Sequence, residues 1–123
     1  PANAAGKWRW ELAVAGKPAV FSLRVAQHFQ SLSGTVSVDG ATWALENARL
    51  RGEEIAFSLI DPRDKTRYEF SGRIAGQAIT GAVQVSAANA QRRLGWDAAR
   101  TELGAPAHAA LKKPTLQDLQ LVQ

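Results

Sequence analysis

Apolar and polar residues alternate one by one along most of this chain. In residues 31–40, SLSGTVSVDG, an extended chain would carry Leu32 and Val36 on one side and serines, threonine and aspartate on the other. Because successive side chains of a β-strand point to opposite faces, this period of two predicts a strand with one buried face. The Asp39–Gly40 pair that follows is typical of a tight hairpin turn.

The same alternation recurs along the chain in short segments separated by turn residues. The alternating segments are residues 7–14, 19–26, 32–38, 43–50, 55–59, 67–74, 79–85 and 94–98. Short strands at regular spacing with turns between them predict an antiparallel meander, and closing it into a barrel removes the exposed edges of an open sheet. We therefore predict an all-β protein, a small antiparallel up-and-down barrel of eight or nine short strands.

The alternation also divides the chain into three parts. Residues 1–5 have the composition of a linker, residues 6–102 form the predicted β-barrel domain, and residues 103–123 form a C-terminal tail. In the tail, Leu116 and Leu119 recur at helical spacing behind Thr115. We expect an irregular segment or a short helix there, docked on the barrel, on a second copy or on another domain.

Composition excludes several classes of chemistry. The chain has no cysteine and only two histidines among its 123 residues, which excludes a disulfide scaffold, thiolate catalysis and zinc ribbons. His28 lies near Ser31 and Ser33, but a histidine at a strand end is more often a turn or packing residue than part of a triad. Asp61 and Asp64 flank a predicted turn, where aspartates bond their own backbone. No catalytic, cofactor-binding or metal-binding residue is predicted, and we expect the chain alone not to be an enzyme.

The start of the chain bears on its origin. It has no methionine, even at position 1, and no apolar run long enough to cross a membrane. We expect an excised C-terminal domain of a longer cytoplasmic protein that does not contact a membrane. A secreted, periplasmic product is the alternative.

The positive net charge of the chain does not by itself predict that it binds nucleic acid. Lysine and arginine exceed aspartate and glutamate by 15 to 11, a net charge of +4. In Lys7–Trp10 the alternation turns the tryptophans inward and the cations outward, so they would not form a stacking platform. Arg92 and Arg93, near Trp96, are interpreted in the same way. We expect a mixed, solvated surface and no nucleic-acid partner.

A ligand cavity inside the barrel is a stronger hypothesis. Barrels of this strand number can hold one small molecule. The candidate ligand-lining residues are the inward aromatic residues Trp10, Phe21, Trp43, Phe57, Tyr68, Phe70 and Trp96. So many rings should fill most of a short barrel, whereas Gly34, Gly72 and Gly81 on the same faces would either leave a pocket or let the sheet curve.

Two positions at opposite ends of the chain carry a family resemblance. Gly6-Lys7-Trp8 in the first predicted strand and Arg100 in the last resemble the Gly-x-Trp and late arginine of the calycin superfamily, which includes lipocalins and fatty-acid-binding proteins. The resemblance implies that Gly6, Trp8 and Arg100 close the barrel, with the arginine over the tryptophan where the first and last strands meet.

A second resemblance covers residues 6–100. The stretches FQSLSGTVSVDGATWALENARLRGEEIAFSL, YEFSGRIAGQAITGAV and WDAAR are similar to a β-domain found after the catalytic domain of some bacterial S-adenosylmethionine-dependent methyltransferases. It implies that this cofactor binds a missing N-terminal domain and that the present chain binds none. The chain would then be a non-catalytic accessory or interaction domain, whose partner is its own catalytic domain or a second copy. The alternative is a lipocalin-like binding protein for a small hydrophobic ligand.

Overall fold

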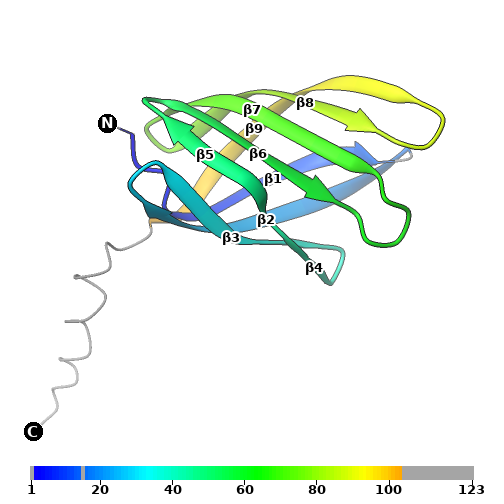
Figure 1. The fold of residues 1–123 in the computed structure, drawn as a ribbon, viewed down its shortest axis with the longest axis horizontal. Helices are drawn as coiled ribbons and strands as arrows, with labels where there is room; N and C mark the ends of the chain where they lie inside the picture. Colours follow the sequence, from blue (N-terminus) through cyan, green and yellow to red (C-terminus); the bar gives the residue numbers. More distant parts are fainter. Residues whose placement is uncertain (1, 15, 104–123) are drawn as a thin grey trace, which may run out of the picture.

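The alternating segments form nine antiparallel β-strands in a computed structural model that describes residues 2–14 and 16–103 (Figure 1). The strands are β1 (Gly6–Val14), β2 (Lys17–His28), β3 (Ser31–Val38), β4 (Ala41–Ala44), β5 (Glu46–Arg51), β6 (Glu54–Ile60), β7 (Arg67–Ala75), β8 (Ala78–Ser86) and β9 (Gln91–Leu103). The described residues contain no helix, and hence no helix suited to crossing a membrane.

Strand pairing closes the sheet on itself. The strands are ordered β2-β1-β9-β8-β7-β6-β5-β3-β4, and a further pairing of β2 with β3 completes a ring of eight strands. β4 lies outside the ring as an extra strand paired with β3. The predicted fold class is thus confirmed as a small closed antiparallel barrel, an architecture compatible with the calycin fold.

The chain between β3 and β6 departs from a simple meander. β4 pairs with the end of β3, whereas β5 pairs with β6 and meets β3 only where Ser31 faces Arg49. Leu45 separates the two strands, and Asn47 has a left-handed backbone with φ of 50° beside a shift in register. Asparagine tolerates this conformation better than most residues, so the bend falls there.

Tight turns join most neighbouring strands. Asp39 and Gly40 both have positive φ, 49° and 81°, as a two-residue hairpin turn of the mirror-image type requires. The predicted hairpin between β3 and β4 is therefore observed. At the β2–β3 turn, Phe29 also has positive φ and is 84% exposed.

Aromatic rings fill the centre of the barrel. Trp10 stacks on Phe21 at 5.5 Å between ring centroids and meets Phe70 and Trp96 edge-on at 5.3 and 5.4 Å. Phe57 stacks on Phe70 at 4.8 Å. These five rings, together with the buried aliphatic side chains, make one continuous core. Any ligand space therefore has to lie toward an end of the barrel.

The ends of the described chain lie next to each other. Gly6, which begins β1, is paired with Leu103, which ends β9. Figure 1 shows the start of β1 and the end of β9 at the end of the barrel where the N-terminus lies. Apart from Leu103, the predicted tail of residues 103–123 and its helix lie outside the described residues.

Candidate ligand site at the open end of the barrel

Trp8 and Arg100 lie together where the first and last strands pair. They are cross-strand partners on β1 and β9, beside a register shift between Lys7 and Trp8. The Arg100 guanidinium carbon lies 4.4 Å from the centroid of the Trp8 ring. The Trp8 indole N–H donates to the Ala4 carbonyl at 2.9 Å, which holds the N-terminal segment beneath it. A guanidinium over an indole face is a cation–π contact.

The same guanidinium ties three separate segments to one another. Arg100 Nη1 donates to the Ala5 carbonyl at 2.8 Å, and Nη2 donates to the carbonyls of Asn3 (2.9 Å) and Gly76 (3.1 Å). Its Nε donates to the side chain of Gln77 at 2.7 Å. Partial burial lowers the Arg100 pKa from its ordinary value. These contacts seal one end of the barrel with the N-terminal segment and the β7–β8 turn.

The opposite end also carries a hollow, comparable in volume with one of about 430 Å³ beside Arg100. A pocket of about 400 Å³ lies there among the start of β2, the β3–β4 turn, β4 and the β6–β7 loop. The β6–β7 loop and the β3–β4 turn lie at the right of Figure 1, away from the N-terminus. The hollow is thus formed by segments that are distant in sequence.

Three aromatic residues form the floor of this hollow. Phe21, Trp43 and Tyr68 all line it. The Trp43 and Tyr68 rings lie 5.7 Å apart with planes 33° from parallel, and Phe21 stands nearly perpendicular to Trp43 at 6.1 Å. Phe21, Trp43 and Tyr68 are only 0%, 4% and 1% exposed, so they form a packed apolar layer beneath the hollow.

Two polar atoms of the floor residues have no hydrogen-bond partner among the described residues. They are the Tyr68 hydroxyl and the Trp43 indole nitrogen, and both side chains are at least nine-tenths buried. Burial raises the pKa of Tyr68 to about 12, with Asp61 and Asp64 adding to the effect, so the phenol stays protonated near neutral pH. The indole nitrogens of Trp10 and Trp96, in the packed centre, likewise have no partner among the described residues, so a missing partner is not confined to this end of the barrel.

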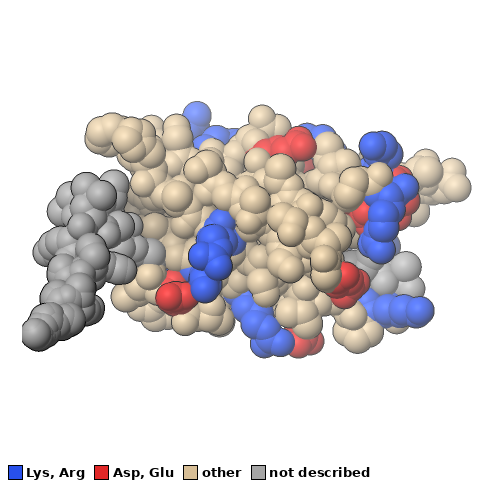
Figure 2. Space-filling view, turned by 90° about the horizontal axis from the view of Figure 1, so that it is seen from below, with Lys and Arg blue, Asp and Glu red and all other residues tan. Residues whose placement is uncertain are grey.

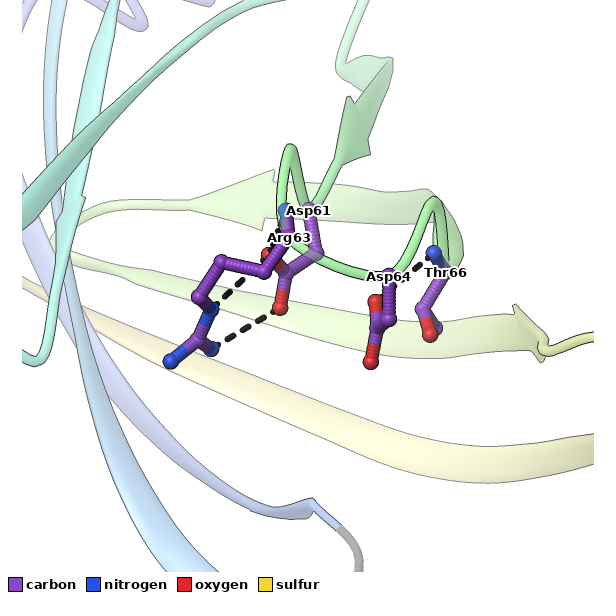
Figure 3. Close-up of polar contacts among 4 residues, drawn as sticks. All are labelled: Asp61, Arg63, Asp64 and Thr66. Carbon is purple, nitrogen blue, oxygen red and sulfur yellow. Dashed lines mark hydrogen bonds and ion pairs between the residues drawn. The ribbon is translucent and has the colours of Figure 1, made fainter.

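The β6–β7 loop forms the rim of the hollow and is held by its own side chains (Figure 3). Asp61 accepts hydrogen bonds from the Arg63 backbone N–H (2.9 Å), from its Nε (3.1 Å) and from its Nη2 (2.9 Å). The Arg63 side-chain hydrogen bond lowers the pKa of Asp61. Asp64 accepts the Thr66 backbone N–H at 3.0 Å, so both aspartates do cap the turn as expected. Figure 3 shows the Arg63 side chain folded back along Asp61.

A second, smaller hollow of about 220 Å³ lies on the other side of this loop. Tyr68 and Asp64 line both hollows, and Val85 and Leu94 contribute apolar surface to the second one. The β6–β7 loop therefore separates the two hollows, and Tyr68 lines both of them.

The candidate ligand-lining residues separate into two groups. Phe21, Trp43 and Tyr68 line the hollow described above, whereas Trp10, Phe57, Phe70 and Trp96 pack against one another in the centre. Phe57 and Phe70 also line a separate hollow of about 440 Å³. Sequence reasoning did not assign the charged rim residues Lys17, Arg63 and Asp39 to a site. The polar run DPRDK predicts a loop, but nothing in its pattern shows which end of the barrel it covers.

The other motifs of the sequence form no site in the described part of the chain. His28 lies edge-on to the exposed Phe29 at 4.8 Å, at the β2–β3 turn. Arg92 and Arg93 are exposed on β9, while Trp96 is buried. In the view of Figure 2, basic and acidic side chains lie singly or in small mixed groups with uncharged surface between them. Among residues 2–14 and 16–103, no three potential metal ligands cluster.

Comparison with known proteins adds no relative to these observations. No protein-family model, no curated protein and no solved structure matches the chain. Functional inference therefore rests on the geometry of the open end.

Proposed function

We propose that this chain is a non-catalytic β-barrel module that binds one small organic molecule at its open end. The observation that carries the proposal is the hollow of about 400 Å³, floored by three aromatic residues and holding a buried hydroxyl without a described partner. Mostly apolar concavities with a few polar groups that fix orientation are the usual form of small-molecule sites.

Each part of the site has a role in this proposal. The floor of Phe21, Trp43 and Tyr68 supplies apolar contact, and the Tyr68 and Trp43 donors orient an acceptor atom of the ligand. The raised pKa of Tyr68 and the lowered pKa of Asp61 keep both groups in one protonation state near neutral pH. Groups that do not change protonation suit recognition better than proton transfer.

A fluorescent hydrophobic amine, N-phenylnaphthylamine, tests the proposal. We expect saturable binding with one site per chain, and we expect Ala19→Trp to abolish it, because Ala19 is buried and lines the hollow. Ala99→Trp is the matched control, since Ala99 is exposed on β9. Circular dichroism checks that both variants fold. Non-saturable binding by the natural chain, or equal binding by the Ala19 variant, would contradict the proposal.

A second proposal rests only on the resemblance described for residues 6–100. We propose that the barrel is an accessory domain carried after the catalytic domain of a cytoplasmic methyltransferase, with that domain or a second copy as its partner. The gene of the full-length protein tests this directly. A cofactor-binding domain encoded upstream supports it, whereas a signal peptide upstream supports a periplasmic lipocalin-like carrier instead.

A further inference from the structure

Phe29 occupies a turn position that suits glycine better than a large apolar residue. It is the first residue of the two-residue turn between the paired His28 and Ser31, and its φ is 60°. Hairpin turns with positive φ at this position favour glycine, because a side chain there crowds the backbone. The other described residues with positive φ are glycines, an aspartate, an asparagine and a lysine. Among them, Phe29 alone carries a large apolar side chain.

Phe29 also gains little from burial in the described part of the chain. It is 84% exposed, more than any other large hydrophobic residue that the structure describes, and its ring meets His28 edge-on at 4.8 Å. The left-handed backbone and the exposed ring both cost free energy, and glycine would avoid both costs. A residue that is unfavourable on two counts points to a role other than folding of the barrel.

Neighbouring segments hold the backbone of this turn in place. Gln27 Nε2 donates to the Phe29 carbonyl at 3.1 Å, and Gln27 Oε1 accepts the Ala4 backbone N–H at 2.7 Å. On the other side, the Leu50 backbone N–H donates to the Gln30 carbonyl at 3.0 Å. The Phe29 ring therefore projects from a backbone that is bonded to the N-terminal segment and to β5.

The described chain ends at the same pole of the barrel. Leu103 is 62% exposed and pairs with Gly6, which on its other side pairs with Val25, four residues before Phe29. At about 3.3 Å per residue and about 4.8 Å per strand, Phe29 and Leu103 lie about 16 Å apart. Residues 104–115 can extend over about 40 Å. The residues that follow them are therefore tethered within reach of Phe29.

We propose that residues 104–123 fold back on this pole and cover the Phe29 ring with the side chains of Leu116 and Leu119. These two leucines lie three positions apart behind Thr115, so one helical turn would place them on one face. A helix this short needs an apolar surface to be stable in water. Tethering gives the segment a high effective concentration at this pole, which favours the chain's own tail over a free partner.

A paramagnetic label on the tail tests the contact. Because the chain has no cysteine, Gln120→Cys provides a single attachment site for a nitroxide. We expect the label to reduce the amide NMR signals of Phe29 and Gln30 to less than about half and to leave those of Asp39 and Gly40, at the opposite pole, unchanged. Equal loss at both poles, or no loss at either, would overturn the proposal.

A mixed sample distinguishes the chain's own tail from that of a second copy. Nitroxide-bearing chains without ¹⁵N are added to ¹⁵N-labelled chains without the nitroxide. We expect no loss of the Phe29 and Gln30 signals, because the contact lies within one chain. A loss equal to that of the singly labelled chain would overturn the proposal in favour of an exchange between copies.

Matched variants test whether the Phe29 ring is what the tail covers. Phe29→Gly suits the positive φ and should preserve the turn, and we expect it to abolish the signal loss at Gln30. Lys65→Gly is the control, because Lys65 also has positive φ, 66°, but lies in the β6–β7 loop at the opposite pole. Signal loss that persists in the Phe29 variant, or that disappears equally in the Lys65 variant, would contradict the proposal.

A double-mutant cycle in the full chain separates the contact from backbone strain. Phe29→Gly is made in the natural chain and in a chain carrying Leu116→Gln and Leu119→Gln. Relief of strain is the same in both backgrounds, so it cancels from the comparison. We expect Phe29→Gly to be about tenfold less favourable for the folding equilibrium constant in the natural chain than in the glutamine chain. Equal effects in both backgrounds, measured by denaturant unfolding, would overturn the proposal.

Discussion

At the scale of single residues, side-chain hydrogen-bond donors have partners at one end of the barrel and lack them at the other. At the sealed end, the Arg100 guanidinium donates to three backbone carbonyls and one side chain. At the open end, the Tyr68 hydroxyl and the Trp43 indole nitrogen have no partner among the described residues. Satisfied donors rigidify a structure, whereas each buried donor without a partner is unfavourable for folding, at this end as for Trp10 and Trp96 in the centre.

Removal of the Arg100 side chain should therefore destabilise the barrel. We expect Arg100→Ala to lower the free energy of unfolding by about 1 to 3 kcal/mol, through the lost contact with Trp8 and the carbonyls left without donors. Arg100→Lys keeps the charge but not the planar fork and should recover only part of the loss. Denaturant unfolding followed by tryptophan fluorescence measures both. Arg93→Ala, at an exposed position, should have little effect, and an equal loss there would refute the argument.

Tyr68 is the only tyrosine of the chain, so its titration can be followed without ambiguity. We expect absorbance near the phenolate band to show a pKa of about 12 in the folded chain, against 10.0 for an ordinary tyrosine. Because the folded state holds this proton more tightly, its stabilising contribution is complete below pH 10 and is lost as the pH rises toward 12. Tyr68→Phe should lack this part of the alkaline destabilisation. A folded-state pKa near 10 would show that the hydroxyl is solvated.

At the scale of the elements, alternation alone predicts most of the strands. Residues 67–74 and 79–85 correspond to β7 and β8 almost position for position, because one face of each is buried and the other is solvated. The separation of β4 from β5 was harder to predict. Leu45 continues the apolar pattern, and the break depends on which neighbour each half pairs with, β3 or β6. Pairing between distant strands is not encoded in local periodicity.

Glycines on the inward face permit close approach of β7 and β8. Gly81 faces Gly72 across the two strands, and a Cβ added at Gly81 would overlap the Ser71 carbonyl oxygen. We expect Gly81→Ala to lower the free energy of unfolding by about 2 to 3 kcal/mol, because backbone must move. Gly95→Ala on β9 meets no atom within 4 Å and should be tolerated. Thermal unfolding of the two variants compares them, and equal melting temperatures would refute the close-packing argument.

The Asp61 carboxylate stabilises the β6–β7 loop by accepting three hydrogen bonds from Arg63. We expect Asp61→Asn to lower the free energy of unfolding at neutral pH by about 1 kcal/mol, at the low end for charged hydrogen bonds because exposed Arg63 is screened by water. The Asp61 pKa is lowered below its ordinary 3.8, chiefly by the Arg63 hydrogen bond, so this stability is present above pH 3.8 and is lost as the pH falls below it. Unfolding curves at several pH values should therefore converge in acid. A constant difference would contradict the pairing.

At the scale of the whole molecule, the candidate site depends on segments that only the closed barrel brings together. Phe21 lies on β2, Trp43 on β4 and Tyr68 on β7, and the rim adds two turns. The sequence predicts that each ring points inward, since each occupies an apolar position of an alternating strand. It does not predict that these three lie at an open end while Trp10 and Trp96 fill the centre. That division follows from strand register and tilt.

The proposed separation of this barrel from methyl transfer is tested with the cofactor itself. We expect isothermal calorimetry to detect no binding of S-adenosylmethionine to the 123-residue chain, because the resemblance places that cofactor in an upstream domain and the chain has no glycine-rich loop between a strand and a helix. Micromolar binding of the cofactor would contradict the proposed division of labour.

The pairing of Gly6 with Leu103 determines how the barrel would be carried by a larger protein. Both ends of the described chain meet at the pole where Arg100 binds the N-terminal segment (Figure 1). The hollow lined by Phe21, Trp43 and Tyr68 lies at the other pole. A polypeptide joined to either end would therefore tether the barrel by its sealed pole and leave the mouth facing outward. Joining the two ends directly, with new termini opened at the exposed β2–β3 turn, should likewise give a circular permutant whose mouth is unaltered.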